Sequence, residues 1–212
     1  HAYYPHNIHF LMVSAQMGGD GNVFLARSNH VLRIDAVSGE LSIVAGTGED
    51  GFGGDGGPAT AALLSRPSGI AVDADGHVFV ADSGNRRIRR IDAATGIIET
   101  VAGGVSRSAG PSDIPFALFD PIGLALDGRR RLYILDQTTP ARMMKLSLQN
   151  GRLTTVATFP SPFEAPNHIV VAPDGRLTVS SRSQIYRVDP GTGVVKVLAG
   201  DADMPGSSAE GM

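Results

Sequence analysis

The sequence predicts an all-β protein, a β-propeller made of four-stranded antiparallel blades. Three observations lead to this prediction. An Asp-Gly pair flanked by apolar runs recurs at intervals of about 50 residues, which is a spacing typical of structural repeats. Each pair belongs to a unit of four short apolar runs, and several of these runs are apolar on both faces. Glycine accounts for 27 of the 212 residues, which indicates a folded chain with many tight turns.

The first two strands of each unit are predicted from the Asp-Gly pairs, which begin at Asp20, Asp75, Asp127 and Asp174. Asp-Gly between two apolar runs is a strong signal for a β-hairpin, because glycine adopts a positive φ without steric cost. The first strand precedes the pair, at residues 8–13, 70–72, 123–126 and 169–171. The second strand follows it, at residues 23–26, 78–81, 132–135 and 177–180.

Two further strands complete each unit. The third strand is predicted at residues 31–35, 88–92, 143–147 and 185–189. After a turn rich in Gly, Ser, Thr and Asn, the fourth is predicted at residues 41–45, 97–102, 153–157 and 194–199. Sheets that are apolar on both faces need a neighbour on each side, which radial stacking in a propeller supplies and a two-sheet sandwich does not. A parallel β-solenoid is the alternative, and the hairpins argue against it.

We therefore expect one propeller domain over residues 1–212, with four blades at residues 5–46, 67–103, 121–157 and 166–200. The loops between blades are expected at residues 47–66, 104–120 and 158–165, and residues 201–212 begin another loop of this kind. In the first loop, Pro58 is expected to start a short helical turn over residues 59–64, because proline suits the first helical position.

The composition excludes several classes of protein. The formal net charge of −3 gives no basic field of the kind on which nucleic-acid binding depends. The absence of cysteine excludes disulfides and thiolate metal sites. No apolar run approaches the roughly 18 residues that a membrane-spanning helix needs. We therefore expect no nucleic-acid partner and no membrane span in this sequence.

The second unit resembles a bacterial NHL repeat. The residues that carry the resemblance are GGDGGPAT at 53–60, PSGIAVD at 67–73, GHVFVADSGNRRIRRID at 76–92 and VAG at 101–103. The other units keep the same frame with fewer matching residues, so the resemblance extends over nearly the whole chain. It implies a propeller of the six-bladed, TolB-like kind. Four blades in a chain that starts with His1 are expected to be part of a longer propeller, and a closed four-bladed ring is the alternative.

Candidate ligand-binding residues lie where the first strands of the blades enter the central channel of such a propeller. Each of them follows a proline: His6, Asn7, Ser68, Asn167 and His168. Histidine is the commonest metal ligand, and residues 166–168 are similar to a pattern in gluconolactonase-type propellers where asparagine binds a metal. The candidate ligands for Ca²⁺ or Zn²⁺ are therefore His6, Asn167 and His168, and the alternative is a polar channel mouth without metal.

Other polar residues in the sequence also allow both a functional and a structural interpretation. Asp50 and Asp55 in the glycine-rich loop could bind a hard cation, but a glycine turn between blades is the favoured interpretation. Asp82 and Asn85 are expected to cap the turn after the second strand of their unit. A basic residue recurs at one register of each third strand, at Arg33, Arg90, Lys145 and Arg187. We expect solvated or salt-bridged blade edges there, with anion or RNA binding as the alternative.

The sequence contains no Ser-His-Asp, Cys-His or HExxH pattern, so no catalytic residue is assigned. We expect a non-catalytic scaffold without a cofactor that binds a protein or a small-molecule ligand. The resemblance implies a bacterial protein that is extracellular or part of the cell envelope. The alternative function is that of a metal-dependent propeller enzyme, similar to an amidating lyase or a gluconolactonase, with its site at the channel mouth.

Overall fold

The computed structural model describes residues 15–17, 20–104, 117–159 and 166–200. Within these residues the chain forms four antiparallel sheets of four strands each, and the strands of every sheet are ordered as they follow one another in sequence. The predicted all-β architecture of four-stranded blades is confirmed.

The strands have the following bounds. The first sheet consists of β1 (Ala15–Met17), β2 (Val23–Arg27), β3 (His30–Ile34) and β4 (Leu41–Ala45). The second consists of β5 (Pro67–Val72), β6 (Val78–Asp82), β7 (Arg87–Ile91) and β8 (Ile98–Gly103). The third consists of β9 (Pro121–Asp127), β10 (Arg131–Asp136), β11 (Ala141–Ser147) and β12 (Leu153–Phe159). The fourth consists of β13 (His168–Val171), β14 (Leu177–Ser180), β15 (Ile185–Val188) and β16 (Val195–Ala199). Two short 3₁₀ helices are η1 (Ala59–Ala61) and η2 (Ser83–Asn85).

The first strand of the first sheet differs from the prediction. The segment expected to form it, residues 8–13, lies outside the described residues. Strand β1 lies nearer to the turn and pairs with β2, with Ala15 opposite Leu25 and Met17 opposite Val23. A short hairpin connection pairs the segments on either side of it, so the residues next to the turn form the strand.

The helical turn in the first inter-blade loop is also shorter than predicted. It ends at Ala61, so it covers only the first half of residues 59–64. Leu63 and Leu64 leave the helix because they form isolated β-bridges with Gly53 and Asp50, which fold the loop back on itself.

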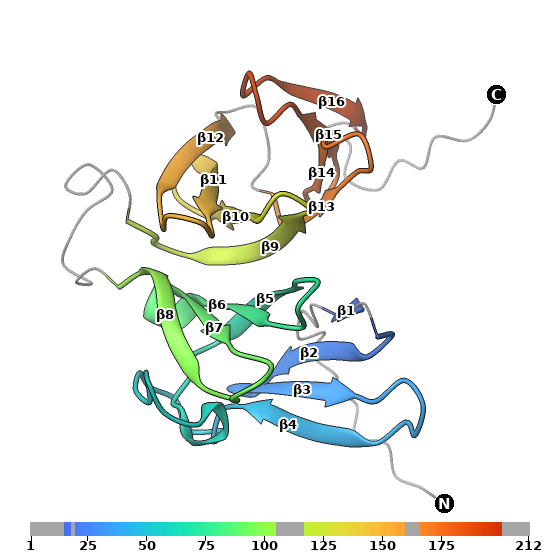
Figure 1. The fold of residues 1–212 in the computed structure, drawn as a ribbon. Helices are drawn as coiled ribbons and strands as arrows, with labels where there is room; N and C mark the ends of the chain where they lie inside the picture. Colours follow the sequence, from blue (N-terminus) through green and yellow to red (C-terminus); the bar gives the residue numbers. More distant parts are fainter. Residues whose placement is uncertain (1–14, 18–19, 105–116, 160–165, 201–212) are drawn as a thin grey trace, which may run out of the picture.

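The four sheets are arranged radially (Figure 1). Strands β1, β5, β9 and β13 surround a common centre, and the other strands of each sheet extend outward from it. Each of these inner strands contacts the inner strand of the next sheet along the chain. The inner strands therefore bring the beginnings of the sheets to one region, where three of the predicted channel-mouth residues, Ser68, Asn167 and His168, are found.

The space between successive sheets is filled by a large side chain from the second strand of the earlier sheet. Phe24, Phe79 and Tyr133 occupy the same position, directly opposite a basic residue of the third strand. Each is buried in a hydrophobic cluster with residues of the following sheet. These three clusters hold the blades together.

The fourth sheet has a different residue at this position. Thr178 pairs with Arg187 in the same register, where the earlier sheets have an aromatic residue. On the same face of this sheet, Val170 and Ile185 are exposed. Among the described residues, no further sheet covers this face.

Carboxylates fix the turn between the third and fourth strands in three of the sheets. Oδ1 of Asp35 accepts hydrogen bonds from the backbone N–H groups two and three residues later, and Asp92 and Asp189 do the same. Because these bonds stabilise the ionised form, they lower the pKa of each carboxyl below its ordinary value.

The aromatic position between blades predicts a large effect on stability. Phe79→Ala removes a fully buried ring and is expected to lower the free energy of unfolding by about 3–5 kcal/mol. Thr178→Ala, at the same register of the fourth sheet, is expected to change it by about 0.5 kcal/mol or less. Denaturant unfolding measures both, and equal effects would contradict the packing described here.

The turn carboxylates predict a pH dependence of stability. A pKa that is lower in the folded than in the unfolded chain adds stability above the unfolded value of about 4, and this stability is lost as the pH falls through the folded value. The variant Asp35→Asn, Asp92→Asn, Asp189→Asn keeps a turn acceptor but has no charge to titrate. Its thermal midpoint should fall less between neutral pH and about pH 3 than that of the wild type. Identical pH profiles would show that the turns do not contribute.

Candidate functional site

Ser68, the predicted ligand-binding residue of the second blade, connects two blades. It lies on β5, and its Oγ is 2.6 Å from Oγ of Ser83. The same oxygen is 3.3 Å from the carbonyl oxygen of Pro121 and 3.2 Å from that of Ile122, both on β9. Ser83 also donates a hydrogen bond to Pro121. The two hydroxyls thus tie the second sheet to the inner strand of the third.

The inner strands approach each other so closely that only glycine fits next to Ser68. A Cβ atom on Gly69 would lie 2.6 Å from the carbonyl oxygen of Ile122 and 3.0 Å from the backbone nitrogen of Leu124. Both contacts are shorter than van der Waals distances. The channel end of β5 is therefore shaped by contact between backbones, which leaves little freedom for its side chains.

The corresponding contact between the third and fourth blades involves Asn167. Its Oδ1 accepts a hydrogen bond of 3.1 Å from Nε2 of Gln137, which also lies 3.3 Å from the carbonyl oxygen of Pro166. The backbone N–H of Asn167 donates to Ser180 at 2.7 Å. The amide oxygen expected to bind a metal is thus used to bridge the two blades.

His168 and Asn167 face different surroundings. His168 is exposed at the start of β13, next to Ile169, which is buried against the third sheet. Because neighbouring strand residues point to opposite faces, His168 lies on the face that carries Val170, away from Gln137. The structure therefore brings Ser68 and Asn167 to interfaces between blades and leaves His168 apart from both. The other two predicted residues, His6 and Asn7, lie outside the described residues.

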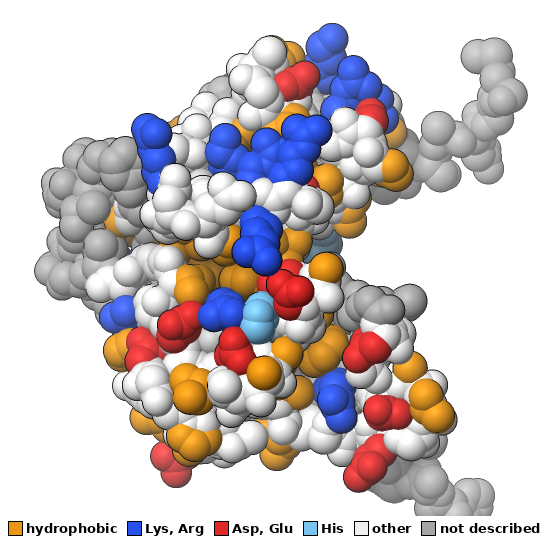
Figure 2. Space-filling view, viewed as in Figure 1, with side chains coloured by type: hydrophobic (Ala, Val, Ile, Leu, Met, Phe, Trp, Pro, Cys, Tyr) orange, Lys and Arg blue, Asp and Glu red, His pale blue; other side chains and the backbone are white. Residues whose placement is uncertain are grey.

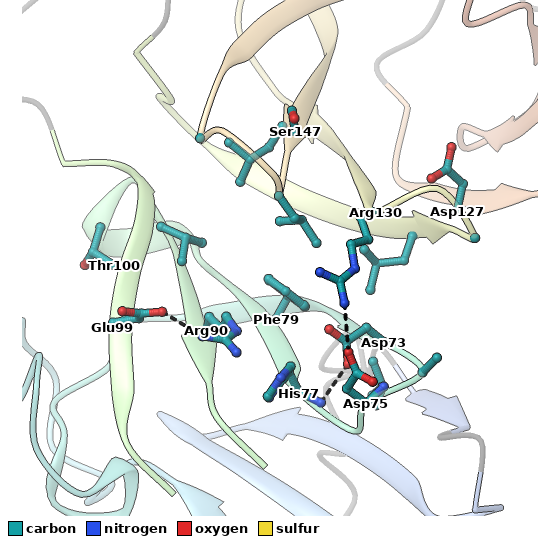
Figure 3. Close-up of a pocket in the computed structure, with 18 residues that line it drawn as sticks. Asp73, Asp75, His77, Phe79, Arg90, Glu99, Thr100, Asp127, Arg130 and Ser147 are labelled. Carbon is teal, nitrogen blue, oxygen red and sulfur yellow. Dashed lines mark hydrogen bonds and ion pairs between the residues drawn. The ribbon is translucent and has the colours of Figure 1, made fainter. Parts of the chain in front are cut away.

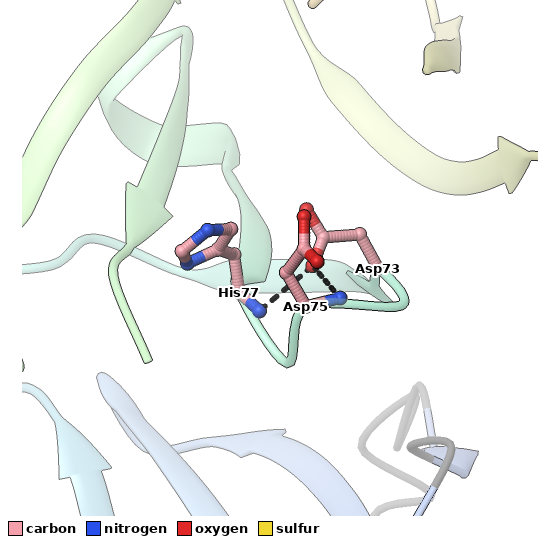
Figure 4. A group of neighbouring side chains, drawn as sticks. All are labelled: Asp73, Asp75 and His77. Atoms are coloured by element: carbon pink, nitrogen blue, oxygen red, sulfur yellow. Dashed lines mark hydrogen bonds between the residues drawn. The ribbon is translucent and has the colours of Figure 1, made fainter. Parts of the chain in front are cut away.

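A group of potential metal ligands that the sequence interpretation missed lies in the β5–β6 hairpin (Figure 4). Asp73, Asp75 and His77 each place one ligand atom within 4.8 Å of the others. Among the described residues, this is the group of three potential metal ligands that lie close enough to share an ion. Their alternating spacing around Asp75-Gly76 was the available signal in the sequence.

The atoms of this group already take part in the hairpin. Oδ1 of Asp73 accepts hydrogen bonds from the backbone N–H groups of Asp75 at 3.0 Å and His77 at 2.9 Å. Nδ1 of His77 accepts one from the backbone N–H of Ala93 at 3.1 Å. A cation at these atoms would compete with the hydrogen bonds that form the turn. Shaping the turn therefore accounts for the group.

The glycine-rich loop is fixed by Arg89, a fully buried side chain of β7. Its guanidinium nitrogens lie 2.8 Å from Oδ1 of Asp55 and 3.3 Å from Oδ2 of Asp82. It also donates to the carbonyl oxygen of Gly53 at 3.1 Å. Asp55, considered above as a cation ligand, also accepts a hydrogen bond of 2.7 Å from Thr100. The loop is thus bound to the second blade by an arginine at its centre.

Asp82 and Asn85 are structural residues, but Asp82 does not cap the following turn as predicted, because its side chain makes no capping hydrogen bond at η2 and is bonded to the preceding loop and to Asn85 instead. Asp82 accepts the backbone N–H of Ser65 at 2.8 Å, and Nδ2 of Asn85 donates to Asp82 at 2.9 Å and to Gly51 at 2.7 Å. Burial raises the pKa of the Asp82 carboxyl, although the hydrogen bonds from Asn85 and Ser65 and the charge of Arg89 act in the opposite direction.

The recurring basic residues of the third strands have different partners. Arg90 forms salt bridges with Glu99 at 2.9 Å and Asp92 at 3.1 Å, as expected for a blade edge. Arg187 is exposed and lies directly across from Lys196 on the next strand.

No helix in the described residues is long and apolar enough to cross a membrane.

Comparison with known sequences places the chain near NHL-containing proteins. A family model described as the teneurin NHL domain matches residues 20–113. Human Teneurin-4 is 32% identical over 176 residues, which are 76% of this chain and 6% of that protein. Protein SUPPRESSOR OF QUENCHING 1, chloroplastic, of Arabidopsis thaliana is 40% identical over 79 residues, 36% of this chain and 7% of that protein. The chain thus spans only a small part of the length of these relatives.

Solved structures with the same fold are more distant in sequence. A chain of a nidogen/laminin complex has a TM-score of 0.67 at 18% identity and covers 89% of this chain and 64% of its own. A gluconolactonase from Xanthomonas campestris has a TM-score of 0.64 at 16% identity, with 86% and 60% covered. Virginiamycin B lyase from Staphylococcus aureus has a TM-score of 0.61 at 18% identity, with 92% and 58% covered. At these identities the likeness concerns the fold alone.

These findings support an NHL-type propeller. The sequence relatives named above come from a plant and a human, so they give no support to the bacterial type expected from the repeat.

The buried arginine yields a prediction about stability. Asp82→Ala removes the buried partner of Arg89 and is expected to lower the free energy of unfolding by about 3–5 kcal/mol, because it leaves a buried charge without that carboxylate. Replacing both residues, with Asp82→Leu and Arg89→Met, should recover much of the loss. The control Asp174→Asn, in an exposed pair with Arg176, should leave the stability nearly unchanged. Denaturant unfolding of the four proteins provides the test, and a double variant less stable than Asp82→Ala would contradict it.

Proposed function

We propose that this protein is a non-catalytic scaffold that binds a partner protein through surfaces between its blades, outside the cell or at the cell envelope. One observation carries the proposal. Ser68 and Asn167, two of the polar side chains at the channel ends of the described inner strands, bond to the neighbouring blade. Side chains that hold blades together are not free to bind a substrate and move protons. A rigid propeller whose surface varies between blades is suited to binding.

A protein is the proposed partner because of a structurally similar chain. One structurally similar chain belongs to a nidogen/laminin complex, so this fold takes part in a complex between proteins in that case. A small-molecule ligand remains the other kind of partner expected from the sequence. Location outside the cell or at the envelope follows from the NHL resemblance.

The second candidate function is that of a metal-dependent propeller enzyme, a lyase or a lactonase. Asn167 and the exposed His168 next to it are the observation that favours it, since both residue types bind metals. A ligand set for a metal would need further residues, because Asn167 and His168 lie on different faces. Fold likeness to a gluconolactonase and a lyase does not by itself transfer their chemistry.

Metal analysis of the full-length protein separates the two functions. The scaffold function predicts that His168→Ala changes neither the content of Zn²⁺ and Ca²⁺ nor the affinity for a purified partner. That partner would be found by cross-linking on intact cells. Thr178→Ala, on the same face, serves as the matched control. If the protein contains stoichiometric metal that is lost in His168→Ala, and if it turns over a lactone, the scaffold function is overturned in favour of the enzyme.

A further inference from the structure

A cleft of about 740 Å³ lies between the second and third blades, at the end of β5 opposite to Ser68 (Figure 3). The β5–β6 hairpin, the beginning of β8, the β9–β10 hairpin and the β11–β12 turn surround it. Its volume is in the range of about 300–1,000 Å³ that is usual for ligand sites. It is separate from the channel mouth, and neither Ser68 nor Asn167 lines it.

The interior of the cleft is lined by both polar and apolar side chains. The larger hydrophobic side chains that line it and are partly exposed are Val72, Val101, Leu126 and Leu148, whereas Phe79 and Leu146 lie buried beneath them. Figure 2 shows hydrophobic surface between the charged side chains of the two hairpins. Apolar surface in such a cleft favours an apolar group of a ligand, because burial removes that group from water.

The rim of the cleft carries an excess of negative charge. Four carboxylates line it, from Asp73, Asp75, Glu99 and Asp127, and two guanidinium groups, from Arg90 and Arg130. The excess persists when partners outside the cleft are included, because Arg131 pairs with Asp127 while Asp92 pairs with Arg90. An anion is therefore disfavoured here, and a cation is favoured.

One cationic side chain already spans the mouth of the cleft. Arg130, on the β9–β10 hairpin, reaches across to Asp75 on the β5–β6 hairpin at 3.4 Å (Figure 3). Both side chains are more than 60% exposed, at 69% and 62%. Exposed ion pairs contribute little to stability, so a ligand can displace Arg130. Asp73, beside Asp75, has no salt bridge within the described residues.

We propose that this cleft binds a short segment of a partner protein in which an apolar side chain stands next to a lysine or arginine. The apolar side chain packs against Leu126 and Leu148, and the cation takes the place of Arg130 beside Asp75 and Asp73. The proposal rests on the function of a protein-binding scaffold and assigns it a position and a chemistry. A metal ion is a poorer occupant, because Asp73 and His77 already hold the turn.

Binding of synthetic peptides to the protein tests the chemistry of the cleft. The probe is a fluorescent peptide of alternating leucine and lysine, four residues long and blocked at both ends. One control replaces both lysines by glutamate, and another replaces both leucines by serine. At low salt, fluorescence anisotropy should show binding of the probe about tenfold tighter than that of either control, because the glutamate peptide loses two charge pairs and the serine peptide loses the burial of two leucine side chains.

Substitutions of charged residues on the rim of the cleft test whether the probe binds there. Asp73→Asn with Asp75→Asn keeps the turn acceptor of Asp73 and should weaken probe binding about tenfold. Arg130→Ala removes the competing cation and should tighten it about threefold, an effect that loss of structure would not produce. Asp174→Asn, in the corresponding hairpin of the fourth blade, should leave it unchanged. Thermal unfolding confirms that each variant is folded.

Three results would overturn the proposal: equal binding of the glutamate peptide, no effect of the Asp73 and Asp75 substitutions, or weaker binding by Arg130→Ala. A partner found on cells separates this assignment from the scaffold function. If the partner binds the Asp73, Asp75 variant as tightly as the wild type, the cleft assignment is wrong while the scaffold function stands. If the probe binds as described but no partner protein is found, the cleft chemistry stands while the scaffold function fails.

Discussion

The structure depends on one constraint, which is that the second and third sheets are apolar on both faces and must be covered on both. Phe24, Phe79 and Tyr133 each point from one blade into the next and are buried there. Since burial of such rings contributes several kcal/mol, radial stacking of the sheets is favoured over any arrangement that leaves one face in water. The tight approach at Gly69 and the hydrogen bonds of Ser68 and Asn167 are consequences of this stacking, because they occur where the inner strands meet.

The same constraint explains why the polar residues near the channel are structural. Backbone groups and hydroxyls that are enclosed between blades must find partners there, since an unsatisfied buried polar group is costly. Two blades satisfy a buried carboxylate at the end of their second strand with an arginine. Asp82 binds Arg89 in the second blade, and Asp136 binds Arg142 at 2.8 Å in the third. In the fourth blade, an uncharged pair replaces this ion pair, because the hydroxyl of Tyr186 donates a hydrogen bond of 2.6 Å to the side-chain oxygen of Gln184. The blades thus share a frame and differ in how they fill it.

Local patterns in the sequence were sufficient for most of the fold. The Asp-Gly pairs and the apolar runs predicted the strands from β2 onward, because both signals arise within a few residues. They did not predict β1, because residues 8–13 are more apolar than the residues next to the turn, and the strand was therefore expected there. The short extent of η1 was also missed, because Leu63 and Leu64 are held by bridges to residues more than nine positions away.

The candidate site was less predictable because it depends on register between sheets. Ser68 and Asn167 were correctly placed at the beginnings of inner strands, but their hydrogen bonds to Pro121 and Gln137 come from other blades. The cleft joins Asp75 to Arg130, which are 55 positions apart, so no local pattern indicates it.

We propose that the partner binds to the surface between blades rather than to the channel mouth. Hydrogen exchange of the full-length protein with and without its purified partner tests this most directly. The account predicts slower exchange at residues 73–77 and 127–131 in the complex, with residues 167–168 unchanged. Slower exchange confined to the channel ends of β5, β9 and β13 would contradict it.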